Sequence, residues 1–151
     1  MRNVPHIRPM TDSDISLIAA RKELVQADSV ALSRMLDTSH GNCHTFLVGR
    51  QPVAIVGASR LWAGVWQVWA IVSNSVRGHG LYFTKGCKII LNSSAVAFRV
   101  RRYNAIVGTK DSEYIRWLNT LGFEYEYTMF GASPDGNDIH GYVKWVERKI
   151  K

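Results

Sequence analysis

Long apolar runs, signal-like segments and polar low-complexity tracts are all missing from this 151-residue sequence. The longest apolar stretch, residues 65–72, is far too short to cross a bilayer and contains a glutamine. The first residues have no apolar central region of the kind a secretory signal needs. We therefore expect no membrane partner, and a chain that stays in the cytoplasm or travels inside a particle assembled there.

Cysteine is also scarce, and the two residues present, Cys43 and Cys87, form no C-x-x-C pair. This spacing does not favour a redox or zinc site, so we expect ordinary reduced, partly buried thiols. Three histidines, His40, His44 and His140, share no metal-ligand spacing with acidic or cysteine neighbours. The sequence therefore predicts no metal site.

The remaining composition is that of a globular protein, with 46% hydrophobic and 21% charged residues. Its length is that of one domain, so we expect residues 1–151 to form a single domain. Nineteen Lys and Arg against 12 Asp and Glu give a net charge of +7. This excess suits an anionic cofactor, an acidic partner or a nucleic acid.

The distribution of the basic residues does not favour the last of these. They are dispersed, and the tightest groups are Arg99, Arg101 and Arg102, and Arg148, Lys149 and Lys151. Neither group interleaves with exposed aromatic residues in a single-strand-binding pattern. Nucleic acid binding is therefore the third of our hypotheses, and we do not expect nucleic acid as the main partner.

The pattern of apolar residues and turn residues predicts a mixed α+β fold. The expected order is a short edge strand, one or two helices, three antiparallel strands, a helix, a strand, a helix and a final hairpin. These elements are expected at residues 4–10, 11–37, 44–72, 81–103, 104–108, 111–122 and 124–148. Such an order gives a mixed, mostly antiparallel central sheet with flanking helices in one domain.

The segment 76–81 joins the third of these antiparallel strands to the long helix and is a candidate anion site. Free N–H groups at a helix start point outward, and the helix dipole favours negative charge. Gly78 and Gly80 let a ligand approach the backbone, and Arg77 adds a positive charge. The alternative is a tight turn that merely needs two glycines. The segment is neither a Walker loop nor a dinucleotide-binding loop.

These residues resemble the phosphate loop of the GNAT family of N-acetyltransferases, Gln/Arg-x-x-Gly-x-Gly/Ala. The sequence matches at Arg77 and Gly80 and departs at Tyr82, where the family has a small residue. A second similarity is the helix that ends in Leu-Gly-Phe at 121–123, with Asp111 at the usual Asn and Leu118 where many members have a Tyr. The resemblance covers nearly the whole chain.

Within the family, residues 105–128 look most like the GNAT-like proteins of short-tailed bacteriophages, of the internal virion protein A type. This resemblance implies acetyl-CoA as co-substrate and transfer of an acetyl group to an amine of a protein or small molecule. It implies cofactor contacts from the main chain of the fourth strand, from the glycine loop and from the following helix start. The candidate residues are Ile71, Val72, Arg77, Gly78, His79, Gly80, Leu81 and Asp111.

The residues that would handle protons match the family poorly. Many members use a Glu on the fourth strand as the base, but residues 66–72 contain no acid. Tyr114 lies one helical turn before Leu118 and is the one catalytic candidate; the alternative is an amphipathic tyrosine that only packs. These departures support a second hypothesis: a phage-type GNAT-fold protein that no longer catalyses and acts through protein contacts in virion assembly or on a host protein.

Two further features concern surfaces. Trp62, Trp66 and Trp69 flank or follow the turn at 63–64, and strand alternation places Trp66 and Trp69 on opposite faces. We expect core packing for at least one of them, and a contact surface if the tryptophan near the hairpin tip is exposed. The terminal hairpin has an exposed edge that could pair with a second copy, so a homodimer is a further expectation.

Overall fold

The computed structural model describes residues 4–19, 37, 39 and 41–146, and its secondary structure is mixed. The helices and strands are, in chain order, β1 (Pro5–Pro9), α1 (Asp12–Ala19), β2 (Cys43–Val48), β3 (Gln51–Trp62), β4 (Val65–Val72), the 3-10 turn η1 (Asn74–Val76), α3 (Gly80–Ala97), β5 (Arg102–Gly108), α4 (Ser112–Thr120), β6 (Glu124–Met129) and β7 (Ile139–Trp145).

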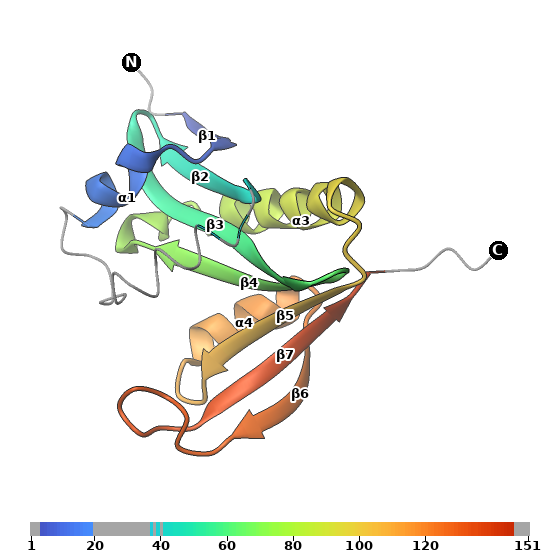
Figure 1. Cartoon of the computed structure of the whole chain (residues 1–151). Helices are drawn as coiled ribbons and strands as arrows, with labels where there is room; N and C mark the ends of the chain where they lie inside the picture. Colours follow the sequence, from blue (N-terminus) through green and yellow to red (C-terminus); the bar gives the residue numbers. More distant parts are fainter. Residues whose placement is uncertain (1–3, 20–36, 38, 40, 147–151) are drawn as a thin grey trace.

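The strands form one seven-stranded sheet in the order β1-β2-β3-β4-β5-β7-β6 (Figure 1). Every neighbouring pair is antiparallel except β4 and β5, which run parallel. The mixed, mostly antiparallel sheet and its flanking helices are confirmed, as is the position of the first strand at an edge. The second half of the helical segment expected at 11–37 lies largely outside the described residues.

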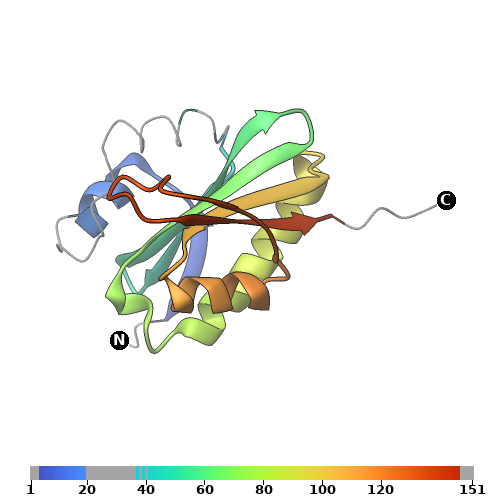
Figure 2. The ribbon, with the colours of Figure 1, turned by 90° about the horizontal axis from the view of Figure 1, so that it is seen from below.

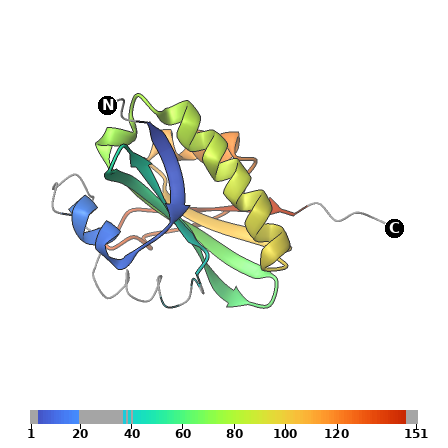
Figure 3. The same cartoon turned by 90° about the horizontal axis from the view of Figure 1, so that it is seen from above.

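The helices cover both faces of the sheet. Helices α3 and α4 lie on one face and α1 on the other (Figures 2 and 3). Successive residues of the central strand β3 face the two sides: Val56 joins the large core under α3 and α4, whereas Ile55 joins a smaller core under α1. A strand covered on both sides needs a continuous apolar run, which 52–58 supplies. None of the described helices is long and apolar enough to cross a membrane.

The long helix α3 differs from expectation at its C-terminal end. It ends at Ala97, not near 103, because Arg99 has a φ of +53° and the chain enters β5 at Arg102. In the middle of the helix, Gly86 allows a close approach to the sheet. An added Cβ at Gly86 would lie 2.5 Å from Cδ1 of Ile7 and 2.6 Å from Cε1 of Phe46.

A buried carboxylate connects the first strand and helix to the sheet. Asp14, which has no exposed surface, accepts hydrogen bonds from Arg8, from the Thr11 amide and from the Thr45 hydroxyl at 2.7–2.8 Å. These bonds, chiefly those from Arg8, hold the pKa of Asp14 well below its usual range. The ionised side chain therefore ties β1, α1 and β2 together.

We expect Asp14→Asn to lower the free energy of unfolding by about 3 kcal/mol at neutral pH, because it leaves Arg8 without its charged partner. Since the folded-state pKa is depressed, the contribution is complete above the ordinary carboxyl value of about 4 and is lost as the pH falls below it. Urea unfolding at several pH values measures both effects. Asp12→Asn, on the exposed side of the same helix, is the control. Equal losses in the two variants would contradict this account.

Candidate functional site

The two parallel strands of the sheet pair only where they begin. Their register runs from Val65 opposite Arg102 to Gln67 opposite Asn104. Beyond that point β4 stays paired with β3 up to Val72, and β5 stays paired with β7 up to Gly108. The strands therefore diverge into a V, which Figure 1 shows opening away from the β3–β4 turn. One side of the β4 backbone over 68–72 faces the gap and has no strand partner in the described part of the chain.

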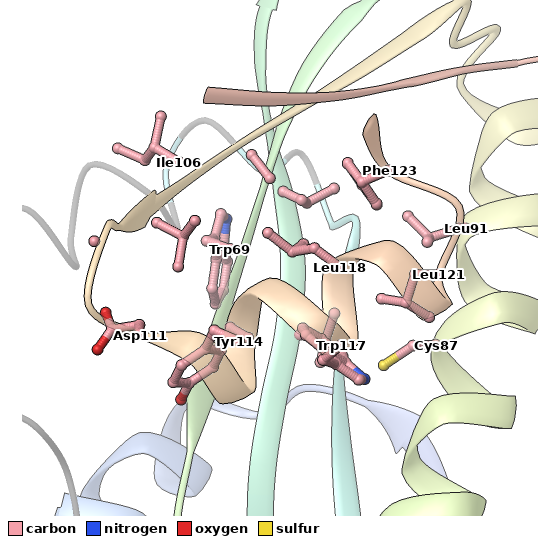
Figure 4. Close-up of a pocket in the computed structure, with 16 residues that line it drawn as sticks. Trp69, Cys87, Leu91, Ile106, Asp111, Tyr114, Trp117, Leu118, Leu121 and Phe123 are labelled. Carbon is pink, nitrogen blue, oxygen red and sulfur yellow. The ribbon is translucent and has the colours of Figure 1, made fainter. Parts of the chain in front are cut away.

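A cavity of about 250 Å³ occupies this gap. Its walls come from both strands and both helices, with Asp111 and Tyr114 at one end and Cys87 and Leu91 at the other (Figure 4). Most of the lining is apolar, and Asp111 is the one carboxylate among the described residues that line it. The site therefore suits an apolar chain that carries a polar or reactive group near Asp111.

One face of α4 closes the cavity. Tyr114, Trp117, Leu118 and Leu121 follow the i, i+3, i+4, i+7 spacing of a single helical face and all line it. The Trp117 ring stacks on Phe83 of α3, with centroids 5.2 Å apart and planes 11° from parallel. Leu118, only 5% exposed, puts an apolar side chain where the family resemblance would place a tyrosine.

Tyr114 is the tyrosine that lines this cavity, and 40% of its surface is exposed. Burial of the ring, with the nearby Asp111 and Glu113 carboxylates, raises the pKa of Tyr114 above its ordinary value. The hydroxyl group is therefore protonated throughout the physiological pH range. Such a group can donate a proton to a leaving group, and its place at the wall of the cavity makes it available to a bound molecule.

The glycine loop lies at the C-terminal end of β4 and leads into α3. Gly78 has a φ of +86°, and an added Cβ at Gly78 or Gly80 would meet no atom within 4 Å. His79 is the N-cap of α3 but makes no capping hydrogen bond with its side chain. The first-turn N–H groups of the helix, including those of Gly80 and Leu81, are therefore open to a ligand from outside.

The loop also contacts the start of α4. Arg77 and Glu113, both about three-quarters exposed, form an ion pair with 3.8 Å between nitrogen and oxygen. Asp111 is the N-cap of α4. The two helix starts therefore lie beside one another at the open end of the V, so the structure brings Arg77, Asp111 and Tyr114 to one region.

Three other residues singled out in the sequence are placed by the structure. Tyr82, at the position where the family has a small residue, makes an edge contact with Phe46 of β2, with ring centroids 6.5 Å apart. Ile71 is buried in the α1-side core, and strand alternation directs its main-chain N–H and C=O groups to Ile55 of β3 and not to the gap. Val72 is half-buried and packs on the opposite core.

Sequence reasoning missed most of the apolar walls. Ala105 and Val107 on β5 and Trp117 on α4 line the cavity, yet none was a candidate. The signal was present, because alternation on β5 and the helical spacing of 114, 117, 118 and 121 each define one face. What the sequence could not supply was the divergence of β4 and β5, which turns these faces into walls.

The thiols and histidines that the structure describes form no cluster suited to a metal ion. Cys43 and Cys87 are both buried and free, and burial raises the pKa of the Cys87 thiol to about 12. His40 lies outside the described residues. Across 4–19, 37, 39 and 41–146, no group of His, Cys, Asp and Glu could hold a metal ion.

Comparison with known proteins finds similarity of structure alone. Neither the protein-family models nor the curated proteins contain a match to the sequence. Among solved structures, Ard1 from Thermoplasma volcanium superposes with a TM-score of 0.77 at 14% identity, covering 95% of this chain and 99% of its own. An acetyltransferase of the GNAT family from Bacillus anthracis has a TM-score of 0.71 at 12% identity, covering 96% of each chain.

A further neighbour was solved with coenzyme A. It is RimL, the ribosomal L7/L12 alpha-N-protein acetyltransferase, with a TM-score of 0.72 at 11% identity and coverage of 94% of each chain. At such identities the similarity shows the fold and not the activity. The chain thus has the fold of the GNAT acetyltransferases.

The stack of Trp117 on Phe83 can be tested separately from any ligand. The indole Nε1 of Trp117 is buried without a hydrogen-bond partner among the described residues, so packing is its main contribution. We expect Trp117→Phe to change the free energy of unfolding by less than about 1 kcal/mol and Trp117→Ala to lower it by about 3 kcal/mol. Urea titrations followed by circular dichroism measure both, and equal losses would contradict the stacking account.

Proposed function

We propose that this protein is an acetyl-CoA-dependent N-acetyltransferase that acts on an amine of a protein or a small molecule. The observation that carries the proposal is the gap between β4 and β5, with an open helix start and an Arg beside its wide end. Support also comes from the fold, which it shares with GNAT acetyltransferases, and from one such neighbour solved with coenzyme A.

The described residues fit acetyl-CoA in three ways. Space at Gly78 and Gly80 and the first-turn amides of α3 suit the pyrophosphate, with Arg77 supplying a countercharge. The unpaired edge of β4, where the main-chain groups of Ala70 and Val72 face the gap, can exchange hydrogen bonds with the amides of the pantetheine arm. The apolar walls at 105, 107, 117 and 118 exclude water around the thioester. His79, Leu81 and Asp111 complete the contacts we assign.

In the reaction, a neutral amine attacks the carbonyl carbon of the thioester, and the carbon–sulfur bond breaks. Main-chain N–H groups at the edge of β4 stabilise the negative charge that develops on the carbonyl oxygen. Tyr114 donates its phenolic proton to the departing thiolate. Asp111 is the carboxylate of the cavity that can receive the proton of the amine, directly or through water.

A second candidate function rests on a specific feature, the acid-free β4 and the buried Leu118 on α4. A GNAT-fold protein of the bacteriophage type can keep the cofactor site and lose the chemistry, acting through protein contacts in virion assembly or on a host protein. The two candidates differ in one respect: the first turns over acetyl-CoA with an amine and the second does not.

The cofactor site is tested by placing bulk and negative charge at the helix start. We expect Gly80→Glu to weaken coenzyme A binding by at least about 100-fold in calorimetric titration, since the side chain would enter the open space and repel the pyrophosphate. Ser93→Glu adds the same charge at an exposed position far along α3 and should bind as the wild type does. Wild-type binding weaker than about 1 mM would refute the proposed cofactor.

The chemistry is tested at the phenol of Tyr114. We expect Tyr114→Phe to lower kcat for acetyl transfer by about 10² to 10⁴-fold while the dissociation constant for acetyl-CoA stays unchanged. Because the pKa of Tyr114 is raised, wild-type activity should show no loss from phenol ionisation below about pH 10. Steady-state assays over a panel of peptide N-termini, lysines and polyamines measure both. Tight cofactor binding without transfer to any amine would favour the second candidate.

A further inference from the structure

A second cationic site lies at the other end of the sheet. A cavity of about 450 Å³ is lined by Arg60 from β3, by the β3–β4 turn, and by Arg99 and Arg101 from the link between α3 and β5. The aromatic rings of Trp66 and Phe98 form its apolar wall. Three guanidinium groups around one hollow present forks that match the geometry of phosphate oxygens.

These three arginines have no carboxylate to neutralise them in the described part of the chain. The described ion pairs use other cations: Arg8 with Asp14, Arg77 with Glu113 and Arg102 with Glu126. No side-chain hydrogen bond is formed by the guanidinium groups of residues 60, 99 and 101 within 4–19, 37, 39 and 41–146. Arginines gathered without counter-ions raise the local positive potential and attract an anion.

The backbone at this end is held rigidly in place. The amides of Arg101 and Arg102 both donate to the carbonyl oxygen of Gly64, at 2.9 and 3.1 Å, and Val146 donates to the carbonyl oxygen of Arg101 at 3.0 Å. The β3–β4 turn, the start of β5 and the end of β7 therefore meet at one end of the sheet (Figure 1). The guanidinium groups are thus presented on a fixed frame.

Arg99 occupies a backbone conformation that does not suit it. Its φ of +53° is the one left-handed value at a non-glycine residue among the described positions, just after the end of α3. Glycine is the usual residue at this point of a helix end, because a side chain there is strained. An arginine kept at such a position, and lining the cavity, indicates a use for its side chain.

The opposite face of the same end carries exposed tryptophans. The strand registers place Trp62, Val65, Arg102 and Trp145 in one row across four strands. Trp62 is 62% exposed and Trp145 is 58% exposed. The guanidinium carbon of Arg102 lies 5.1 Å from the centroid of the Trp145 ring. Two large flat rings are therefore open to solvent at the same end of the sheet as the arginine cavity, on the other face.

We propose that this end of the sheet binds single-stranded nucleic acid that passes around the β3–β4 turn, with phosphates in the arginine cavity on one face and bases stacked on Trp62 and Trp145 on the other. Cationic side chains combined with exposed aromatic rings hold single strands, because the charges follow the backbone and every base has a face to stack. An acidic protein would satisfy the charge but would leave the two indoles without a matching partner. The net charge of +7 adds a long-range attraction for a polyanion.

This site is separate from the proposed cofactor site. The arginine cavity lies where β4 begins and the glycine loop lies where β4 ends, so the eight residues of the strand separate them by about 23 Å. The proposal therefore does not depend on acetyl transfer. Binding of an oligonucleotide should persist when coenzyme A is present in saturating amount.

The test is fluorescence anisotropy with the full chain and labelled single-stranded oligonucleotides, at about 50 mM salt and at increasing salt. We expect dissociation constants between about 1 and 100 μM and a log–log salt slope of about −2, since three arginines each contribute about −0.7. The double variant Arg60→Glu with Arg101→Glu should lose at least about tenfold in affinity. Arg50→Glu, at the exposed β2–β3 turn on the far end, is the matched control.

Two further variants separate binding from folding. Arg99→Gly should weaken binding and reduce the magnitude of the salt slope by about 0.7, while its Tm is equal to or higher than that of the wild type. Trp62→Ala should lose several-fold in affinity with an unchanged slope, because stacking carries no charge. Its exposed side chain can be removed without loss of core packing.

Three results would overturn the proposal. The first is no binding with dissociation constants below about 1 mM at low salt. The second is binding that Arg99→Gly, Trp62→Ala and the double variant affect no more than Arg50→Glu does. The third is equally tight binding of poly-glutamate with the same dependence on all variants, which would make the site a docking surface for acidic protein segments.

Discussion

The separation of β4 from β5 beyond the Gln67–Asn104 pair is the constraint on which the rest of the site depends. Each strand keeps its other neighbour, so the sheet remains continuous while one edge of β4 loses its hydrogen-bond partner. An unpaired backbone edge beside an apolar cavity is an unfavourable arrangement unless a ligand or water satisfies it. The face of α4 that fills the gap supplies apolar walls but no backbone partner. The fold therefore favours an extended ligand that has polar groups to pair with the edge of β4 and apolar parts to fill the cavity.

The two cationic sites of the molecule lie at opposite ends of the same strand, β4. The glycine loop and Arg77 lie at its C-terminal end, and the three arginines of the second cavity lie at its N-terminal end. At the first of these sites, the carboxylate of Glu113 forms an ion pair with Arg77 and partly neutralises its charge. The second site has no such counter-ion in the parts of the chain that the structure describes. The two anions that we propose as ligands, a compact pyrophosphate and a longer polyanion, would thus bind at different ends of one sheet.

Much of this architecture could be predicted from the sequence, since strand alternation, helical spacing and the glycine loop are local signals. The chain order and the edge position of the first strand followed from them, as did the opposite faces of Trp66 and Trp69. The predicted C-terminal end of α3 was wrong, because nothing in the local sequence indicates that Arg99 adopts a left-handed backbone conformation. Contacts between segments distant in sequence were also out of reach. The basic residues near 100 show no interleaved aromatic residue in sequence, yet the fold brings Trp145 beside Arg102 and Trp62 to the same end of the sheet.

The central claim is that the gap along β4 is a ligand site, and amide hydrogen exchange tests it most directly. Exchange of the full chain is measured with and without coenzyme A, residue by residue. The account predicts slower exchange for amides on the unpaired edge of β4 within 68–72 and for the first turn of α3, with no change at the β3–β4 turn. Unchanged exchange along β4 at saturating coenzyme A, or protection confined to the arginine cavity, would contradict it.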